Sequence, residues 1–480
     1  MPPHTMSPLD ASFLHVEDAV SHMHIGSVAL FEGPPPGHED VMAAIESKLP
    51  LVPRYRQKVR FLPLDLARPV WVDDPHFNLE YHVRRTAMPS PGGDEQLRRL
   101  VGRVMSQKLD RTKPLWEMWV AEGLEQNRWA LLSKIHHSMV DGVSGTDLMA
   151  VLLDSERDAP RADPEPWVPE REPSTAHILT SALAARATSP YEATRSAWSA
   201  VRGPRRAARG AADLARAGIS LRNLLQPASG SSLNGPIGPH RRWGWARSRL
   251  SDVKTIRTAQ GGTVNDVVLA VITRGFRDLL TQRGENVEGR VVRTMVPVSV
   301  RSETERGTYN NKVSAMFADL PVGIADPLER LASVRAQMEG LKESRQAVAG
   351  STLTSLSGFA PAMLLALGGR VATRTPQRSV NTVTTNVPGP QRPMFLEGCR
   401  MLEYFPFVPL AGSVRIGVAI VSYDGGLNFG VTGDYEAAPD VGVLCEGIEA
   451  GIAELLALSQ PPPPKTRTSR AKRPAARPTG

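Results

Sequence analysis

A long segment of unusual composition divides this chain into two halves. Residues 156–238 open with prolines and acidic residues, as in DAPRADPEPWVPEREP, and continue into an alanine- and arginine-rich stretch with few large apolar side chains. Such a composition is typical of a linker with surface helices. The sequence alternates between strand-like and helix-like patterns on both sides of it, and 480 residues exceed what one hydrophobic core usually organises. The chain is therefore predicted to form two α/β domains.

We assign residues 1–155 to an N-terminal domain, 156–238 to the linker, 239–459 to a C-terminal domain and 460–480 to a tail. Hydrophobic periodicity predicts strands at 23–32, 57–64, 77–86, 114–124, 128–135, 291–301 and 311–322. The same criterion, with capping residues, predicts helices at 38–49, 94–109, 144–154, 263–280, 326–341 and 441–458. Residues 414–436 are predicted to form a hairpin that turns at Asp424-Gly425.

The positive charge of the chain is concentrated in two places. The net charge is +8, yet residues 186–222 alone carry eight arginines against Glu192 and Asp213, and the tail after Ser459 carries six basic residues and no acid. The rest of the chain is therefore net acidic. The proline-rich basic tail is predicted to be disordered. No nucleic-acid-recognition motif accompanies the charge, so no nucleic-acid partner is expected.

The sequence favours a cytoplasmic protein. The N-terminus has neither the basic start nor the apolar centre of a signal peptide, and two cysteines, Cys399 and Cys445, cannot build a disulfide framework. The stretch Gln346–Gly369 has no charged residue and could be read as a membrane span. Pro361 and the frequent Gly, Ser and Thr favour a buried or lipid-facing helix instead.

Two adjacent histidines, His136 and His137, follow a predicted strand in the stretch KIHHSMVDGVSG. A histidine in such a loop can act as a general base, because its ordinary pKa is about 6.5. Asp141 is placed to anchor the loop, and Gly142 permits a backbone path that a Cβ would obstruct. On spacing alone, a structural histidine remains an alternative. A metal site is disfavoured, because adjacent histidines point in different directions and no third ligand stands at a suitable spacing.

The motif and its context resemble the bacterial wax ester synthase/diacylglycerol acyltransferase family, within the CoA-dependent acyltransferase superfamily. HHSMVDG matches the HHxxxDG motif, which peptide condensation domains share. Further matches run in order along the chain: SPLDASFLHVED, MHIG, PLWEMW, LNGPIGPHRR, TVNDVVLA, MVPVSVR, NNKVS, NVPGP and SYDGGLNFG. The set in this order is far more specific than the motif alone. The linker and the tail lie outside the resemblance.

The resemblance implies two similar domains, each a mixed sheet with flanking helices, and a tunnel between them that acyl-CoA and the acceptor alcohol enter from opposite faces. His137 would be the general base, His136 would support the loop, Asp141 would orient it and Gly142 would form its turn. A thioester is already activated, so no acyl-enzyme is expected. Ser138 is disfavoured as a nucleophile because no separate base and orienting residue are evident beside it.

Four other residues are weaker candidates for substrate binding. Asn265 and Asp266 begin a predicted helix, where their simplest role is N-terminal capping. Thr384 and Asn386 belong to the predicted strand NTVTTN, which could line the tunnel near the thioester.

The activity that the resemblance implies is transfer of a long-chain fatty acyl group from acyl-CoA to diacylglycerol, with formation of triacylglycerol. A fatty alcohol as acceptor, giving a wax ester, is the main alternative. A condensation domain and a catalytically weak lipid-surface protein are more distant ones. No cofactor and no metal are expected. Because the acceptor is a lipid, the protein is expected to contact the inner face of the cell membrane or lipid droplets peripherally.

Overall fold

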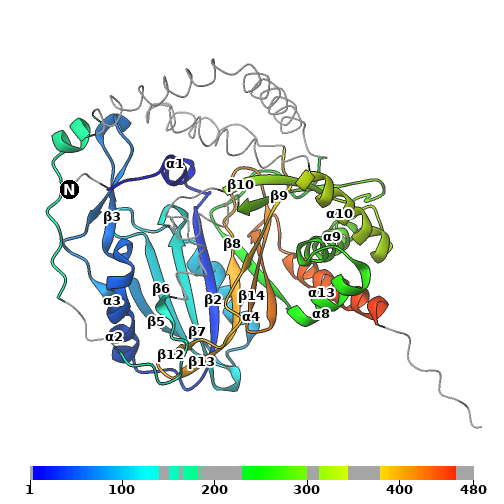
Figure 1. The fold of residues 1–480 in the computed structure, drawn as a ribbon, viewed down its shortest axis with the longest axis horizontal. Coiled ribbons are helices and arrows are strands. Elements are labelled where there is room, and N and C mark those ends of the chain that lie inside the picture. The colour runs from blue at the N-terminus through cyan, green and yellow to red at the C-terminus, as the bar shows by residue number, and fades with distance from the viewer. Residues whose placement is uncertain are drawn as a thin grey trace, which may run out of the picture.

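A computed structural model describes residues 4–139, 151–161, 166–181, 184, 230–299, 313–343 and 379–460. Its described part is built on two six-stranded mixed sheets that lie side by side, the first formed mainly by the N-terminal half and the second by the C-terminal half (Figure 1). This arrangement confirms the predicted fold class of two α/β units with flanking helices.

The first sheet has the strand order β12-β13-β2-β7-β6-β5. Its strands are β2 (His24–Glu32), β5 (Val83–Ala87), β6 (Trp116–Leu124), β7 (Arg128–His136), β12 (Phe395–Leu396) and β13 (Cys399–Phe407). Only β5 and β6 pair in parallel. Strands β12 and β13 come from the second half of the chain, and β13 pairs with β2, the third strand of the sheet. The two halves of the chain therefore share one sheet.

Helices and a small three-stranded sheet complete this half. The helices are α1 (Pro8–Val16), α2 (His38–Lys48), α3 (Leu79–His82) and α4 (Asp94–Met105). The small sheet has the order β1 (His4–Thr5), β4 (Val70–Asp73) and β3 (Gln57–Arg60). Both faces of the main sheet are buried: Ala29 and Phe31 of β2 join one apolar cluster, while Val28 and Leu30 join another that includes α4 and β8.

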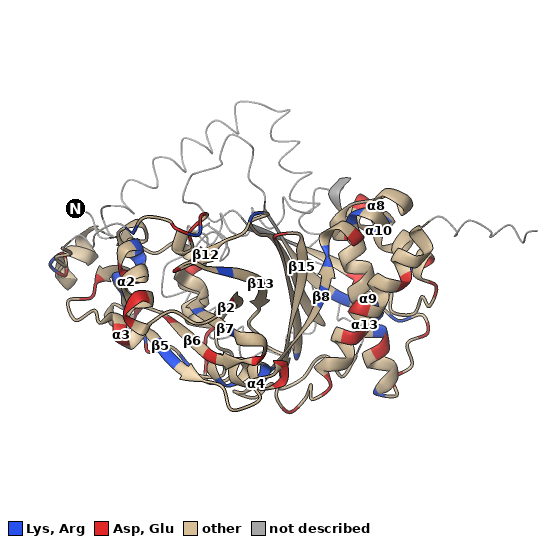
Figure 2. Ribbon diagram, turned by 90° about the horizontal axis from the view of Figure 1, so that it is seen from below, with Lys and Arg blue, Asp and Glu red and all other residues tan. Residues whose placement is uncertain are grey.

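The second sheet has the order β10-β9-β11-β14-β15-β8. Its strands are β8 (Arg241–Arg249), β9 (Val292–Ser299), β10 (Val313–Leu320), β11 (Thr382–Pro388), β14 (Ile416–Tyr423) and β15 (Gly426–Asp434). Four helices lie on its outer side: α8 (Leu250–Gln260), α9 (Val264–Gln282), α10 (Pro327–Glu343) and α13 (Val441–Ser459) (Figure 2). The predicted hairpin is confirmed, since Tyr423 pairs with Gly426 across Asp424-Gly425, both of which have positive φ.

The two sheets meet where β13 crosses β15. A Cβ on Gly430 of β15 would lie 1.7 Å from the carbonyl oxygen of Pro406 in β13, and the same oxygen accepts a hydrogen bond of 3.3 Å from Trp243 Nε1. Beside this point the ring of Phe405 stacks on Trp245, with centroids 5.0 Å apart. The junction therefore depends on a backbone-to-backbone contact that only glycine permits.

Two predicted strands differ from the structure. In the segment 77–86, residues Leu79–His82 form one helical turn, because Asn78 caps it by accepting a hydrogen bond of 2.9 Å from the Glu80 N–H, and the strand begins only at Val83. In the segment 57–64, the strand ends at Arg60, and Pro63 starts a 3₁₀ turn that runs to Asp65.

Candidate active site

The motif histidines stand at the end of a central strand. Strand β7, between β2 and β6, ends at His136, and a 3₁₀ turn begins at His137 and ends at Met139. Both backbones are fixed by neighbouring segments: the His136 N–H donates to the Leu115 carbonyl at 2.9 Å, and the His137 N–H donates to the Met23 carbonyl at 2.8 Å. The strand-to-loop position predicted for the pair is confirmed.

The His137 side chain is held against helix α1. Its ring stacks on Phe13 with a centroid distance of 4.0 Å and an interplanar angle of 27°. The residue as a whole is half-buried, and its ring Nδ1 is buried and has no hydrogen-bond partner among the described residues. Burial lowers the pKa of His137 to about 4. The imidazole is therefore neutral at pH 7, and one of its two nitrogens carries a lone pair that can accept a proton.

The His136 side chain is buried, and its two ring nitrogens face different groups. Its Nδ1 lies 3.1 Å from the backbone N–H of Ser138 and 2.7 Å from the Ser138 hydroxyl oxygen. Its Nε2 lies 3.6 Å from a carboxylate oxygen of Glu17. Burial lowers the pKa of His136, so this ring is also neutral at pH 7.

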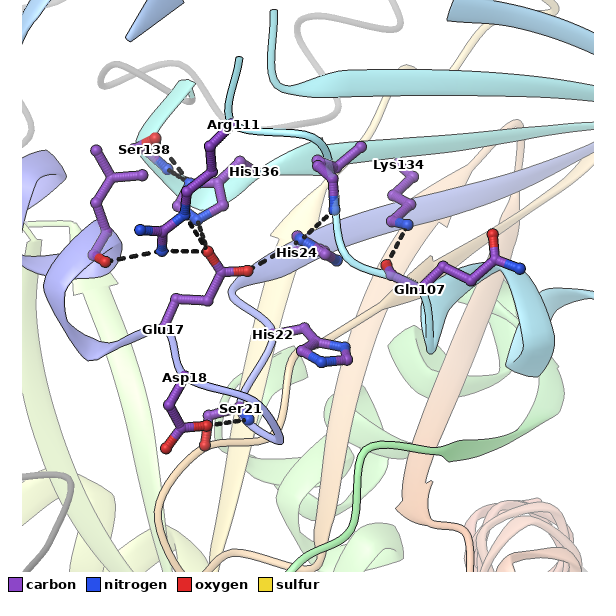
Figure 3. A network of polar contacts seen from close by, with 12 residues as sticks. Glu17, Asp18, Ser21, His22, His24, Gln107, Arg111, Lys134, His136 and Ser138 are labelled. Carbon is purple, nitrogen blue, oxygen red and sulfur yellow. Dashed lines mark hydrogen bonds and ion pairs between the residues drawn. The ribbon is translucent and has the colours of Figure 1, made fainter. Parts of the chain in front are cut away.

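Glu17 forms the centre of a buried polar network that the sequence analysis did not predict (Figure 3). Its side chain is 2% exposed and pairs with Arg111, whose Nε donates at 2.9 Å and whose terminal nitrogen also contacts the carboxylate. His24 Nε2 lies 3.4 Å from the other oxygen. Burial alone would raise the pKa of Glu17. The close imidazoles of His136 and His24 and the charge of Arg111 outweigh it and hold the pKa well below its usual range.

A second unpredicted group is Lys134, which is fully buried on β7 two residues before His136. Its ammonium donates to the Val104 carbonyl at 3.0 Å and to the Gln107 carbonyl, at the C-terminal end of α4. A cation is favourable there, because the last carbonyls of a helix are unpaired and carry partial negative charge. Burial lowers the pKa of Lys134 to about 8. The lysine thus ties the motif strand to α4.

The four weaker candidates lie in the second half of the chain, and two of them, Asn265 and Asn386, contact each other. Asn386 Nδ2 donates to Asn265 Oδ1 at 3.5 Å, and the Thr384 and Thr294 hydroxyl oxygens are 2.8 Å apart. Asp266 completes a capping box with Thr263, whose N–H donates to the Asp266 carboxylate at 2.7 Å. No hydrogen bond or ion pair between described residues links these four to His137.

Several other sequence predictions lie outside the described residues. These are the motif residues Asp141 and Gly142, the arginine-rich stretch 186–222, the uncharged stretch Gln346–Gly369 and the tail beyond Gln460. Among the helices that the structure describes, none is both long and apolar enough to span a bilayer. The described residues also contain no cluster of three or more His, Cys, Asp or Glu side chains suited to a metal ion.

The lowered histidine pKa values predict that the protein loses stability in mild acid. Burial lowers the pKa of His24 to about 3 and those of His82 and His137 to about 4. Between pH 6.5 and 4 the unfolded chain therefore binds protons that the folded protein does not. The free energy of unfolding should fall by up to about 1.4 kcal/mol per pH unit for each such histidine. Urea unfolding at pH 7, 6 and 5 measures this, and equal midpoints would contradict it.

The surroundings of Ser138 differ from what the sequence predicts. The sequence offered no base and orienting residue beside Ser138, whereas the fold places His136 against its hydroxyl and Glu17 behind His136. The carboxylate comes from α1, far away along the chain, so no local pattern could reveal it. Ser138 is nevertheless 1% exposed, which leaves its hydroxyl no open approach for a thioester.

Two family models match the chain almost end to end. The wax ester synthase/diacylglycerol acyltransferase catalytic domain matches residues 6–268, and the WS/DGAT C-terminal domain matches residues 309–456. A protein named probable diacylglycerol O-acyltransferase, from Mycobacterium tuberculosis, is 39% identical over 463 residues, which are 95% of this chain and 96% of that protein.

Solved structures of similar proteins match the chain over nearly its whole length. The wax ester synthase/diacylglycerol acyltransferase from Marinobacter aquaeolei VT8 is 25% identical, with a TM-score of 0.66, and the match covers 95% of this chain and 99% of that one. The first condensation domain of the CDA synthetase is 16% identical, with a TM-score of 0.55 and coverage of 95% and 96%. The latter likeness shows a common fold alone.

Proposed function

Because the chain belongs to the wax ester synthase/diacylglycerol acyltransferase family, we propose that it transfers a long-chain fatty acyl group from acyl-CoA to diacylglycerol, forming triacylglycerol. The observation that carries the choice of acceptor is the 39% identity, over 95% of the chain, to a protein named diacylglycerol O-acyltransferase. Identity to the Marinobacter protein, whose name covers both activities, is 25%. Wax ester synthesis from a long-chain fatty alcohol is therefore the second candidate.

His137 would act as the general base. As the acceptor oxygen attacks the thioester carbonyl carbon, the hydroxyl proton passes to the neutral imidazole. A base with a pKa of about 4 takes this proton only once the new C–O bond makes the hydroxyl acidic, so transfer accompanies attack. The tetrahedral intermediate collapses with cleavage of the C–S bond, and the imidazolium returns the proton to the CoA sulfur. Acyl group, proton and electron pairs balance without an acyl-enzyme.

The other motif residues would support this step. His136 would hold the turn, Asp141 would orient it and Gly142 would permit its backbone path. The Asn265–Asn386 pair and Thr384 would line the opposite wall of a tunnel between the two halves, with Asp266 holding the start of α9. Acyl-CoA and the acceptor would enter this tunnel from opposite faces.

The reaction and its acceptor can be tested directly. Purified protein is given radiolabelled palmitoyl-CoA with diacylglycerol or hexadecanol in parallel, and the lipid products are separated. Labelled triacylglycerol as the main product supports the proposal, and labelled wax ester as the main product supports the alternative. Release of free palmitate alone would contradict both.

A lipid acceptor also requires contact with a lipid surface, and the linker is the proposed contact. Residues 186–222 carry eight arginines, with Leu214, Ile219 and Leu221 among them and Leu224 and Leu225 directly after them. A basic amphipathic segment gains up to about 1 kcal/mol per basic residue near anionic lipid, in addition to shallow apolar burial. The protein would thus work in the cytoplasm, on the inner face of the membrane or on lipid droplets.

This contact predicts a salt-sensitive vesicle affinity. Changing Arg202, Arg205, Arg206 and Arg209 to glutamine should weaken sedimentation with anionic vesicles and raise the vesicle-borne diacylglycerol needed for half-maximal rate. Activity on detergent-dispersed acceptor should stay nearly unchanged, and high salt should mimic the substitutions. If neither the substitutions nor high salt weakens vesicle binding, the contact belongs to another surface. Gln346–Gly369 would then be the next segment to test.

A further inference from the structure

The proposed chemistry does not use the buried carboxylate of Glu17. This carboxylate lies beside His136, the residue that precedes the proposed base His137. It stands at the C-terminal end of α1, where its own N–H donates to the Phe13 carbonyl at 3.2 Å. Its two oxygens face Arg111, His24 and the Nε2 of His136 (Figure 3). A charged group is rarely buried without such partners, because desolvation costs several kcal/mol.

The hydrogen bonds of His136 fix which of its nitrogens carries the proton. The Ser138 backbone N–H can only donate, and it points at His136 Nδ1 from 3.1 Å. Nδ1 must therefore be the acceptor, and the proton of the neutral ring must sit on Nε2. Nε2 lies 3.6 Å from a carboxylate oxygen of Glu17, which is close enough for electrostatic attraction but longer than a hydrogen bond. Hydrogen bonds to Ser138 thus fix the ring at Nδ1, and the negative charge of Glu17 faces its Nε2 end.

Helix α1 acts on the histidine pair at two points. Phe13 stacks on the ring of His137, and Glu17, one turn later, faces the ring of His136. Arg111 ties this end of the helix down: besides the carboxylate, its guanidinium bonds the Leu14 carbonyl at 2.9 Å. A shift of the Glu17 end of α1 would therefore move the surface against which His137 is stacked.

We propose that Glu17 is a positioning residue for the transfer reaction: its carboxylate holds His136 and the end of α1, and thereby fixes the orientation of His137. The inference rests on the proposed role of His137 as the base. Glu17 touches neither substrate in this scheme. It acts through His136 and Phe13, much as a second layer of hydrogen bonds orients a ligand or base elsewhere.

Two other roles for Glu17 make different predictions. Glu17 could serve only to neutralise Arg111, in which case removing both charges together should restore activity. Alternatively, Ser138, His136 and Glu17 could act as a nucleophile, its base and an orienting carboxylate, in which case Ser138→Ala should abolish turnover. Under our proposal, Ser138→Ala removes one of two bonds to Nδ1, and the backbone N–H still holds the ring.

The experiment compares Glu17→Gln, the double variant Glu17→Gln/Arg111→Gln, Ser138→Ala and the surface control Glu446→Gln, each measured per mole of folded protein. Misplacing a catalytic group by about 1 Å can cost roughly 100-fold in rate. We therefore expect kcat to fall about 10- to 100-fold in both Glu17 variants, with KM for palmitoyl-CoA within about threefold of wild type. Ser138→Ala should lower kcat less than about fivefold.

A second measurement is independent of turnover. Stacking on Phe13 should shift the His137 ring protons upfield in the NMR spectrum, with His137→Ala used to assign them. In Glu17→Gln these signals should move toward their unstacked positions, and in Glu446→Gln they should not. Unchanged ring signals, or a kcat that recovers in the double variant, would overturn the positioning role. A wild-type protein without any acyl transfer would refute the proposed function instead, while the ring signals would still decide the role of Glu17.

Discussion

Replacing His137 with alanine is expected to lower kcat by roughly 10²–10⁴-fold, the usual contribution of a general base. The ring is neutral at pH 7 and stacked on Phe13, while the backbone N–H bond of His137 to Met23 does not depend on the side chain. The substitution therefore removes the proposed base and leaves the turn attached. Initial rates with saturating palmitoyl-CoA and acceptor measure the loss.

The control for this variant is His76→Ala, which truncates an exposed histidine and should keep wild-type rates. Circular dichroism and urea unfolding should show both variants folded, because the lost stacking contact is worth only about 0.5–1.5 kcal/mol. A folded His137→Ala protein with at least a third of the wild-type kcat would remove His137 from the mechanism.

The parts of the fold that local patterns determine were predictable from the sequence. Helix α9 begins after Thr263 because a capping box and an apolar face stand together in the sequence, and the hairpin turns at Asp424-Gly425 because both residues tolerate positive φ. The position of strand β13 beside β2 was not predictable from the sequence. Its pairing with β2 depends on the fit of two segments from opposite halves of the chain, and no local pattern encodes such a partner.

The candidate site likewise has parts that local sequence patterns predict and parts that depend on distant residues meeting in the fold. The end of β7 at His136 follows from an apolar run that stops at polar residues. Glu17 and Arg111 are 94 residues apart and meet only in the folded protein. One signal did exist: Glu17 and His24 both lie in segments that carry the family resemblance, VED and MHIG, although their side chains had no assigned role.

The junction between the sheets leads to the second large prediction, Gly430→Ala. The added Cβ would lie 1.7 Å from the Pro406 carbonyl oxygen, far inside van der Waals contact, and the obstacle is backbone and not a flexible side chain. Relief requires β13 to move away from β15, which breaks the Trp243–Pro406 hydrogen bond and separates Phe405 from Trp245. We expect a loss of about 3 kcal/mol or more in the free energy of unfolding.

Gly442→Ala is the matched control, because Gly442 lies exposed in the first turn of α13 and a Cβ there would meet nothing within 4 Å. Alanine favours a helix over glycine, so this variant should be as stable as wild type or slightly more stable. Because β13 belongs to the same sheet as β7, the strain in the Gly430→Ala protein should also reach the histidine turn. The folded fraction of this variant should therefore transfer acyl groups more slowly than the Gly442→Ala protein. Equal unfolding midpoints for the two variants would mean that the sheets do not meet at Gly430, and that the halves of the chain are joined elsewhere.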